Sequence, residues 1–164
     1  MKTVPLLFHA VDGVLFGNYA GEYQLRPGVK SWLKWVHENF ELVWLTSWES
    51  EEMKALLRVL HHEKSSDSPE TPPFHHANWT NCENKVAWVE QAVQKLKGRE
   101  WFWIDDDIDQ FTQEIQAAGI PLDRCIQSNP QGADELLIIR STLAGRLEWL
   151  QTTENGSGGE DRAA

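Results

Sequence analysis

The chain has 164 residues, of which 41% are hydrophobic and 24% are charged, so it is neither a fully disordered nor a collagen-like chain. Its length predicts a single globular domain. A net charge of -10 disfavours non-specific binding of nucleic acid, although it leaves room for a small basic groove. Two cysteines are too few for a disulfide scaffold, and the sequence shows neither a signal-peptide layout nor an apolar run of the ~18 residues that span a bilayer. We therefore expect a cytoplasmic protein without a membrane partner.

Strands and helices are expected to alternate along the chain. Short continuous apolar runs predict buried strands, and apolar residues spaced three or four apart predict amphipathic helices. The expected strands are residues 4–10, 41–46, 101–105 and 122–127. The expected helices are residues 29–40, 51–61, 85–96, 111–118 and 133–150.

This order predicts an α/β three-layer sandwich with a parallel sheet and helices on both of its faces. We expect one domain over residues 1–150 and a flexible tail over residues 151–164, because the segment from Thr152 onward has no large apolar residue. The Ser- and Pro-rich segment Glu63–Pro73 is expected to be a loop.

Polar residues suited to phosphate or metal chemistry follow the expected strands. The pair Asp12-Gly13 follows the first strand, Thr46-Ser47 ends the second, and Asp105-Asp106 ends the third, while Lys85 begins a helix. Each feature alone is typical of an ordinary turn, cap or solvated charge. Together they indicate a site, because ligands of such folds bind at the carboxyl ends of the strands.

The same positions resemble the haloacid dehalogenase (HAD) superfamily of metal-dependent phosphohydrolases over about residues 3–150. The four matching motifs are Phe8–Leu15, Leu42–Thr46, Lys85 at a helix start, and Trp103–Asp106. The chain is most similar to small, uncharacterised HAD-domain proteins of actinobacteria and their phages. The resemblance implies a HAD-like Rossmannoid sandwich, hydrolysis of phosphomonoesters through an aspartyl-phosphate, and Mg²⁺ as cofactor.

The resemblance also implies roles for individual side chains. Asp12 would protonate the leaving group and then activate water, and Lys85 would neutralise phosphate charge. Thr46, with Ser47 as its neighbouring alternative, would donate a hydrogen bond to a phosphoryl oxygen. Gly13 would let the chain turn sharply beside the bound phosphate.

The expected metal ligands are the main-chain carbonyl of Asp12 and the carboxylates of Asp105 and Asp106, because Mg²⁺ prefers hard oxygen ligands. Asp107 and Asp109, later in the same acidic run, are expected to cap the following helix.

Ala10 departs from the family pattern, because it occupies the position of the nucleophilic aspartate. Alanine can neither attack phosphorus nor bind a metal. Three explanations stay open: a deliberate Asp→Ala change, a natural pseudoenzyme, or another nucleophile such as His9. Strand alternation points the side chain of His9 away from that of Ala10, so we expect His9 to pack beneath the site. The chain as written is therefore expected to be inactive or nearly so.

The substrate is expected to be a phosphorylated compound. Without a cap domain the site would be open, which would admit a macromolecular substrate. The segment Gly17–Pro27 is too short for a cap domain, although it suffices for a small flap. Two alternatives are a non-catalytic module that binds phosphate or a phosphopeptide, and a phosphatase that processes nucleic-acid ends. Basic residues near the flap would support the second alternative; they are Arg26, Lys30 and Lys34.

Two further interpretations concern the tryptophans and the histidines. The nine tryptophans are expected to pack in the core, and exposure of Trp32, Trp35 or Trp48 would instead indicate an assembly surface. The histidine pairs 61–62 and 75–76 with Cys82 have no standard zinc-site spacing, and the cysteines are expected to be small buried residues.

Overall fold

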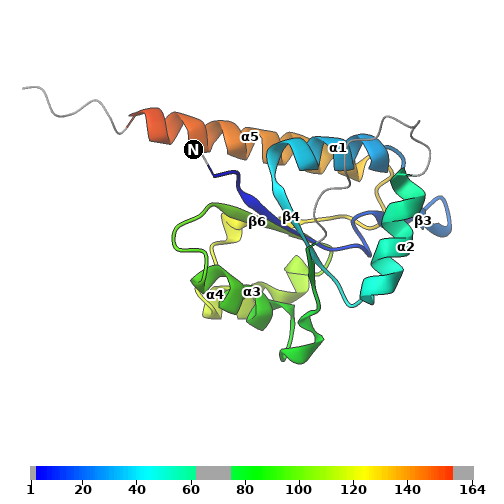
Figure 1. Ribbon diagram of the computed structural model, residues 1–164, viewed down its shortest axis with the longest axis horizontal. Coiled ribbons are helices and arrows are strands. Elements are labelled where there is room, and N and C mark those ends of the chain that lie inside the picture. The colour runs from blue at the N-terminus through cyan, green and yellow to red at the C-terminus, as the bar shows by residue number, and fades with distance from the viewer. Residues whose placement is uncertain (1–2, 62–74, 157–164) are drawn as a thin grey trace, which may run out of the picture.

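A computed structural model describes residues 3–61 and 75–156 of the chain. Its centre is a five-stranded parallel sheet with the strand order β5-β4-β1-β6-β7 (Figure 1). The strands are β1 (Leu6–His9), β4 (Glu41–Leu45), β5 (His76–Ala77), β6 (Trp101–Asp105) and β7 (Cys125–Gln127).

Helices cover both faces of the sheet, so the α/β sandwich expected from the sequence is confirmed as a Rossmann-like arrangement (Figure 1). One face carries α1 (Val29–Asn39), α2 (Ser50–His61) and α5 (Glu135–Gly156). The other face carries α3 (Lys85–Gln94) and α4 (Thr112–Ala117). Short 3-10 helices occupy Trp79–Asn81, Ile108–Phe111 and Leu122–Arg124.

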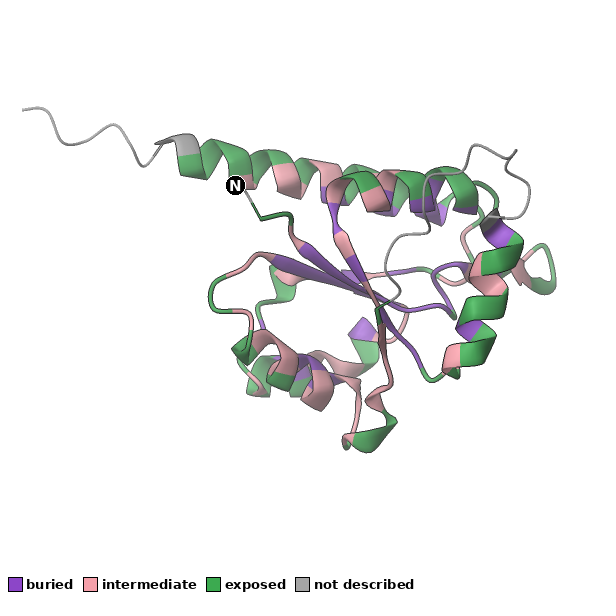
Figure 2. Ribbon diagram, in the orientation of Figure 1, coloured by how far each residue is buried: buried purple, intermediate pink, exposed green. Residues whose placement is uncertain are grey.

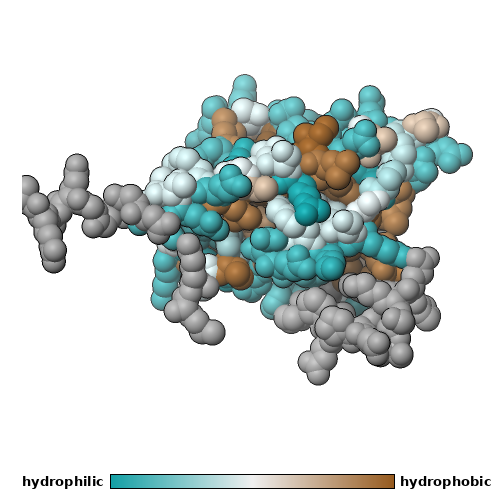
Figure 3. Space-filling model, turned by 90° about the horizontal axis from the view of Figure 1, so that it is seen from above, coloured by the Kyte–Doolittle hydropathy of each residue, from teal (hydrophilic) through white to brown (hydrophobic). Residues whose placement is uncertain are grey.

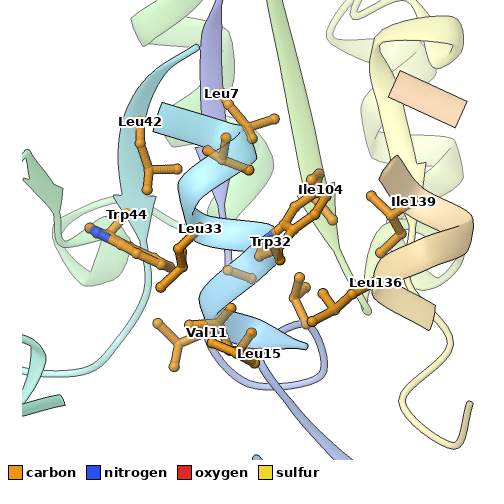
Figure 4. Close-up of a cluster of buried hydrophobic side chains, with 14 of the residues drawn as sticks. Leu7, Val11, Leu15, Trp32, Leu33, Leu42, Trp44, Ile104, Leu136 and Ile139 are labelled. Carbon is orange, nitrogen blue, oxygen red and sulfur yellow. The ribbon is translucent and has the colours of Figure 1, made fainter. Parts of the chain in front are cut away.

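Strand alternation divides the core into two layers. Along β1, Leu7 packs with the α1 and α5 side, whereas Leu6 and Phe8 pack with the α3 and α4 side. Both layers are apolar, which is why the strands read as continuous hydrophobic runs and appear buried in Figure 2. Figure 4 shows the first layer, in which Trp32 and Leu33 of α1 lie over the sheet.

A β-hairpin precedes α1. Its strands are β2 (Phe16–Tyr19) and β3 (Glu22–Leu25), and Asn18 pairs with Tyr23. The two-residue turn Ala20-Gly21 has positive φ at both positions, 54° and 79°, as the turns that match the twist of a hairpin require. The small flap expected over residues 17–27 therefore takes the form of this hairpin.

Two expected strand starts are wrong. The last strand begins at Cys125 instead of Leu122, because the amides of Arg124 and Cys125 bond to the carbonyls of Pro121 and Leu122 and close a 3-10 turn. The first strand begins at Leu6 rather than Val4, whose side chain is 48% exposed and adds nothing to the core.

The last helix, expected to end at residue 150, continues to Gly156. Residues 151–154 are exposed, and the hydroxyl groups of Thr152 and Thr153 donate to the carbonyl of Trp149. The helix thus continues through exposed residues, where its hydrogen bonds persist beyond the apolar positions that predicted its end. The rest of the expected tail and the expected loop at 63–73 lie outside the described residues.

Aromatic side chains are mostly inside. Trp32 is buried, and Trp35 and Trp48 are half-buried, so they do not form an exposed aromatic surface. The face seen from above in Figure 3 is largely hydrophilic, with separate hydrophobic patches. Across residues 3–61 and 75–156, no helix combines the length and the apolar composition that crossing a bilayer requires.

Candidate functional site

The carboxyl ends of three neighbouring strands form the edge where the candidate site lies. His9 of β1 is in register with Trp44 of β4 and with Ile104 of β6. The chain therefore leaves all three strands at the same level, just before Ala10, Thr46 and Asp106. β1 has neighbours reached by connections on opposite faces, which is where such sheets bind ligands.

An acidic cluster follows β6. The carboxylates of Asp105, Asp106 and Asp107 each place one oxygen within 4.8 Å of the others. Lys85, at the first position of α3, places its Nζ 2.9 Å from Oδ1 of Asp105 and 2.9 Å from Oδ2 of Asp107. Asn84 caps that helix by accepting from the amide of Ala87, which fixes the start of α3 beside the cluster. Burial alone would lower the pKa of Lys85, but the two carboxylates outweigh it and raise the pKa.

Asp105 is the buried member of this cluster. Its side chain has no solvent exposure, and its Oδ2 has no hydrogen-bond partner. Beside it, burial first and then the charge of Asp107 raise the pKa of Asp106 from 3.8 to about 6. An unpartnered buried carboxylate oxygen next to a crowded second carboxylate favours either a shared proton or a bound cation.

Gly13 allows Asp106 to approach the loop after β1. A Cβ on Gly13 would lie 2.1 Å from Cγ of Asp106, and the φ of Gly13 is 76°. The carbonyl of Gly13 accepts hydrogen bonds from Ser128 Oγ at 2.6 Å and Arg26 Nη2 at 3.0 Å. The loops that follow β1 and β7 are thus joined behind the cluster.

Asp12 is exposed, and both of its carboxylate oxygens accept hydrogen bonds. Tyr23 of the hairpin donates its hydroxyl to Oδ1, and Trp48 of the β4–α2 connection donates its Nε1 to Oδ2 at 2.9 Å. Burial and this contact raise the pKa of Tyr23, so its hydroxyl stays protonated and remains a donor. Asp12 is therefore held from two sides by groups that the sequence analysis did not identify.

Thr46 and Ser47 follow β4 at the same edge. Thr46 is buried, and its Oγ1 accepts a hydrogen bond from the amide of Trp48 at 3.1 Å. Its hydroxyl hydrogen stays available for donation, because Oγ1 acts only as an acceptor in this contact. Ser47 is exposed. No contact joins either hydroxyl to Asp12, Lys85 or Asp105 among the described residues.

Ala10 is buried and carries no group that can react. The neighbouring His9 is fully buried, with Trp32 donating to its Nε2 at 2.9 Å and its Nδ1 lying 2.5 Å from the carbonyl oxygen of Ala10. Burial lowers the pKa of His9 to about 4. The prediction that His9 packs in the core is confirmed, and because both of its ring nitrogens are engaged there, we do not propose His9 as the nucleophile.

Asp107 and Asp109 do not act as the expected helix caps. The 3-10 helix that follows has no side-chain cap, because the carboxylate of Asp107 bonds to Lys85 instead. The amide of Asp109 bonds to Oε1 of Gln127, whose Nε2 bonds to the carbonyl of Asp106. Gln127 therefore supports the acidic loop from β7.

Of the three basic residues that would support a nucleic-acid groove near the flap, Arg26 is not exposed on the surface. Arg26 is 2% exposed, and it donates to the main-chain carbonyls of Val14, Gly13, Asn129 and Gly132. Lys30 and Lys34 are exposed on α1. Arg26 is thus a buried structural cation rather than a contact for nucleic acid.

The cysteines and histidines form no metal-binding group in the described part of the chain, where the acidic cluster is the candidate. Cys125 is buried as expected, whereas Cys82 is half-buried, and both are free thiols.

The residues at the acidic cluster fit Mg²⁺. All the available donors are hard carboxylate oxygens, and Oδ2 of Asp105 lacks any other partner. Lys85 occupies Oδ1 of Asp105 and Oδ2 of Asp107, which leaves Asp105 Oδ2, the carboxylate of Asp106 and Asp107 Oδ1 as candidate oxygens for a cation. Ala10 supplies no carboxylate, so one expected ligand is missing.

No protein-family model matches this chain, and no curated protein is significantly similar to it.

Three residues of the site were not predicted. Tyr23 and Trp48 bond to Asp12, and Asp107 bonds to Lys85. For Asp107 the signal was the acidic run itself, because Asp107 follows Asp105 closely and Lys85 contacts both carboxylates. Tyr23 has no such signal, since its position depends on how the hairpin folds back over the sheet edge.

Proposed function

We propose that this chain is a HAD-type, Mg²⁺-dependent phosphohydrolase scaffold that binds phosphomonoesters and lacks its nucleophile. The observation that carries the proposal is the meeting of Lys85 with Asp105, whose second oxygen is unpartnered, beside the Asp12-Gly13 loop. This arrangement provides one fixed cation, one candidate metal position and one exposed acid at a single sheet edge.

The proposed roles follow from these contacts. Lys85 and a Mg²⁺ ion held by Asp105 and Asp106 would offset phosphate charge, and the hydroxyl of Thr46 would donate to a phosphoryl oxygen. Asp12 would give a proton to the leaving oxygen and later take one from water. A carboxylate at position 10 would attack phosphorus and release the alcohol, and water would then cleave the aspartyl-phosphate.

The test restores the missing nucleophile. Hydrolysis of p-nitrophenyl phosphate with Mg²⁺ is compared for the unchanged chain, for Ala10→Asp and for Ala10→Asn, which matches the size of aspartate without its charge. We expect only Ala10→Asp to turn over. Rapid hydrolysis by the unchanged chain would show that the catalytic centre is assigned wrongly.

A second candidate function is a non-catalytic module that binds phosphate or a phosphopeptide. The buried Ala10, which offers no nucleophile, favours it. Calorimetric titration with inorganic phosphate separates the two candidates: saturable binding without turnover in Ala10→Asp supports the binding module. We propose the cytoplasm as the compartment, where the thiols of Cys82 and Cys125 would stay reduced.

A further inference from the structure

Three aromatic rings surround the exposed acid of the candidate site. Phe16 and Tyr23 of the hairpin stack with ring centroids 5.5 Å apart and an interplanar angle of 13°. The ring of Trp48 also packs against Phe16, with 5.7 Å between the centroids and an interplanar angle of 32°. Tyr23 and Trp48 also donate to the two oxygens of Asp12. The aromatic group is therefore tied to the carboxylate and is not an independent patch.

Tyr23 has one free ring face. Phe16 covers one side of the ring, yet Tyr23 remains 52% exposed, so its second face is open to solvent. The hydrogen bond from its hydroxyl to Asp12 fixes the ring beside the site. A fixed aromatic ring with an open face suits offset stacking with another planar ring.

The position of this ring relates it to the leaving group. Under the proposed function, Asp12 protonates the ester oxygen, so that oxygen must lie within hydrogen-bond reach of Asp12. The carbon skeleton attached to the oxygen then begins next to the groups that hold Asp12. Tyr23 and Trp48 are those groups.

We propose that Tyr23 and Trp48 determine specificity for phosphomonoesters whose alcohol carries an uncharged planar ring next to the ester group. The inference rests on the proposed function. The ring stacks on the open face of Tyr23 while the phosphate lies toward Lys85. An anionic ring is disfavoured, because Asp12, Asp106 and Asp107 already place negative charge at this edge.

The experiment uses the unchanged chain, which binds without turnover. Calorimetric titrations with Mg²⁺ present compare benzyl phosphate with cyclohexylmethyl phosphate, which have the same charge and connectivity and differ in the planarity of the ring. We expect benzyl phosphate to bind about three- to tenfold more tightly, the range of one aromatic pair. Equal affinities of the two esters would overturn the inference.

Variants locate the preference on the hairpin. Tyr23→Leu, which keeps an apolar side chain but removes the plane, should abolish the preference, whereas Tyr23→Phe should retain it. Tyr19→Phe is the matched control, because it removes a hydroxyl from the same hairpin that bonds to the carbonyl of Leu25 and not to Asp12. If Tyr23→Leu still bound benzyl phosphate more tightly than cyclohexylmethyl phosphate, the ring of the ligand would not stack on Tyr23, and the inference would be overturned.

A titration with inorganic phosphate distinguishes failure of the ring preference from failure of the proposed function. If phosphate and both esters bind alike, the phosphate site stands and the ring preference fails. If neither phosphate nor either ester binds, the proposed function fails, and the ring preference fails with it.

Discussion

Gly13 and Asp106 lie in such close contact that the loop after β1 has no room for a side chain where it passes the acidic loop after β6. A Cβ at Gly13 would lie 2.1 Å from Cγ and 2.3 Å from Oδ2 of Asp106. The ends of β1 and β6 can therefore lie this close only because glycine at position 13 has no Cβ. This contact sets the distance between the exposed acid Asp12 and the acidic cluster.

Replacing Gly13 by alanine should destabilise the fold and disturb the cluster. Positive φ costs an alanine about 1–2 kcal/mol, and the overlap with Asp106 should add roughly 1–3 kcal/mol. Gly21→Ala is the matched control, because Gly21 has a similar φ of 79° and open space around its Cβ position. Urea unfolding should show the larger loss for Gly13→Ala; equal losses would show that Asp106 moves aside at no cost.

Removing the charge of Lys85 should cost much more than removing an exposed lysine. In Lys85→Met the fully buried Asp105 would keep its charge without a counter-ion, which typically costs about 3–5 kcal/mol. Lys54→Met, which breaks an exposed pair with Glu51, should change stability by less than about 1 kcal/mol. Chemical denaturation of both variants checks this prediction, and equal losses for Lys85→Met and Lys54→Met would contradict it.

His9 should make the protein less stable in mild acid. Its pKa falls from 6.5 in the unfolded chain to about 4 in the folded one, so the unfolded state binds the proton more tightly. Stability from neutral His9 is complete above pH 6.5 and is lost as pH falls toward 4, by about 3 kcal/mol in all. His9→Gln keeps an acceptor for Trp32 and should flatten the difference between pH 7 and pH 4.5. His75→Gln, at an exposed position, is the control, and an unchanged slope in His9→Gln would contradict the prediction.

Asp106 should affect the pH dependence of stability in the direction opposite to His9. Its folded-state pKa is raised from 3.8 to about 6, so its ionisation in the folded state is disfavoured, and stability falls as pH rises through 6. Asp106→Asn should therefore stabilise the chain at pH 8, by about 1 kcal/mol because the side chain is half exposed and screened by water. Asp109→Asn, at an exposed carboxylate, should give no such gain. Thermal unfolding without divalent ions at pH 8 and pH 4 provides the measurement.

The same Asp106 variant tests the proposed metal site. We expect Asp106→Asn to weaken Mg²⁺ binding in isothermal titration, even though it stabilises the metal-free chain, because it removes an anionic ligand. Opposite signs for stability and metal affinity would distinguish a ligand from a residue with a purely structural role. Unchanged Mg²⁺ affinity would place the cation elsewhere.

The sheet and its edge could be predicted because both depend on local pattern. The runs at residues 102–104 and 42–45 are apolar throughout, as strands that are covered on both faces require. Asp12, Thr46 and Asp105 lie at or just beyond the carboxyl ends of their strands, so a parallel arrangement alone brings them to one edge. The same logic placed His9 beneath the site, because alternate side chains of a strand point to opposite faces.

The contacts that complete the site could not be predicted, because they depend on how non-local segments fold back. Tyr23 reaches Asp12 only after the hairpin turns at Ala20-Gly21. Arg26 looked like a surface cation, yet it is buried by carbonyls from the loop after β7. The extension of α5 beyond Leu150 arises from helix hydrogen bonds rather than from apolar periodicity, the signal that set the expected bound.

The carbonyls bound by Arg26 have a consequence for the order in which the protein assembles. Asn129 and Gly132 lie 103 and 106 residues further along the chain than Arg26. During synthesis, the hairpin and the loop that carries Asp12 therefore emerge long before the segment that fixes them. Contacts this distant in sequence form late, since the intervening chain must first be ordered. We therefore expect the hairpin and the loop that carries Asp12 to reach their final positions only after the carboxyl-terminal third of the chain has been synthesised and has packed against Arg26.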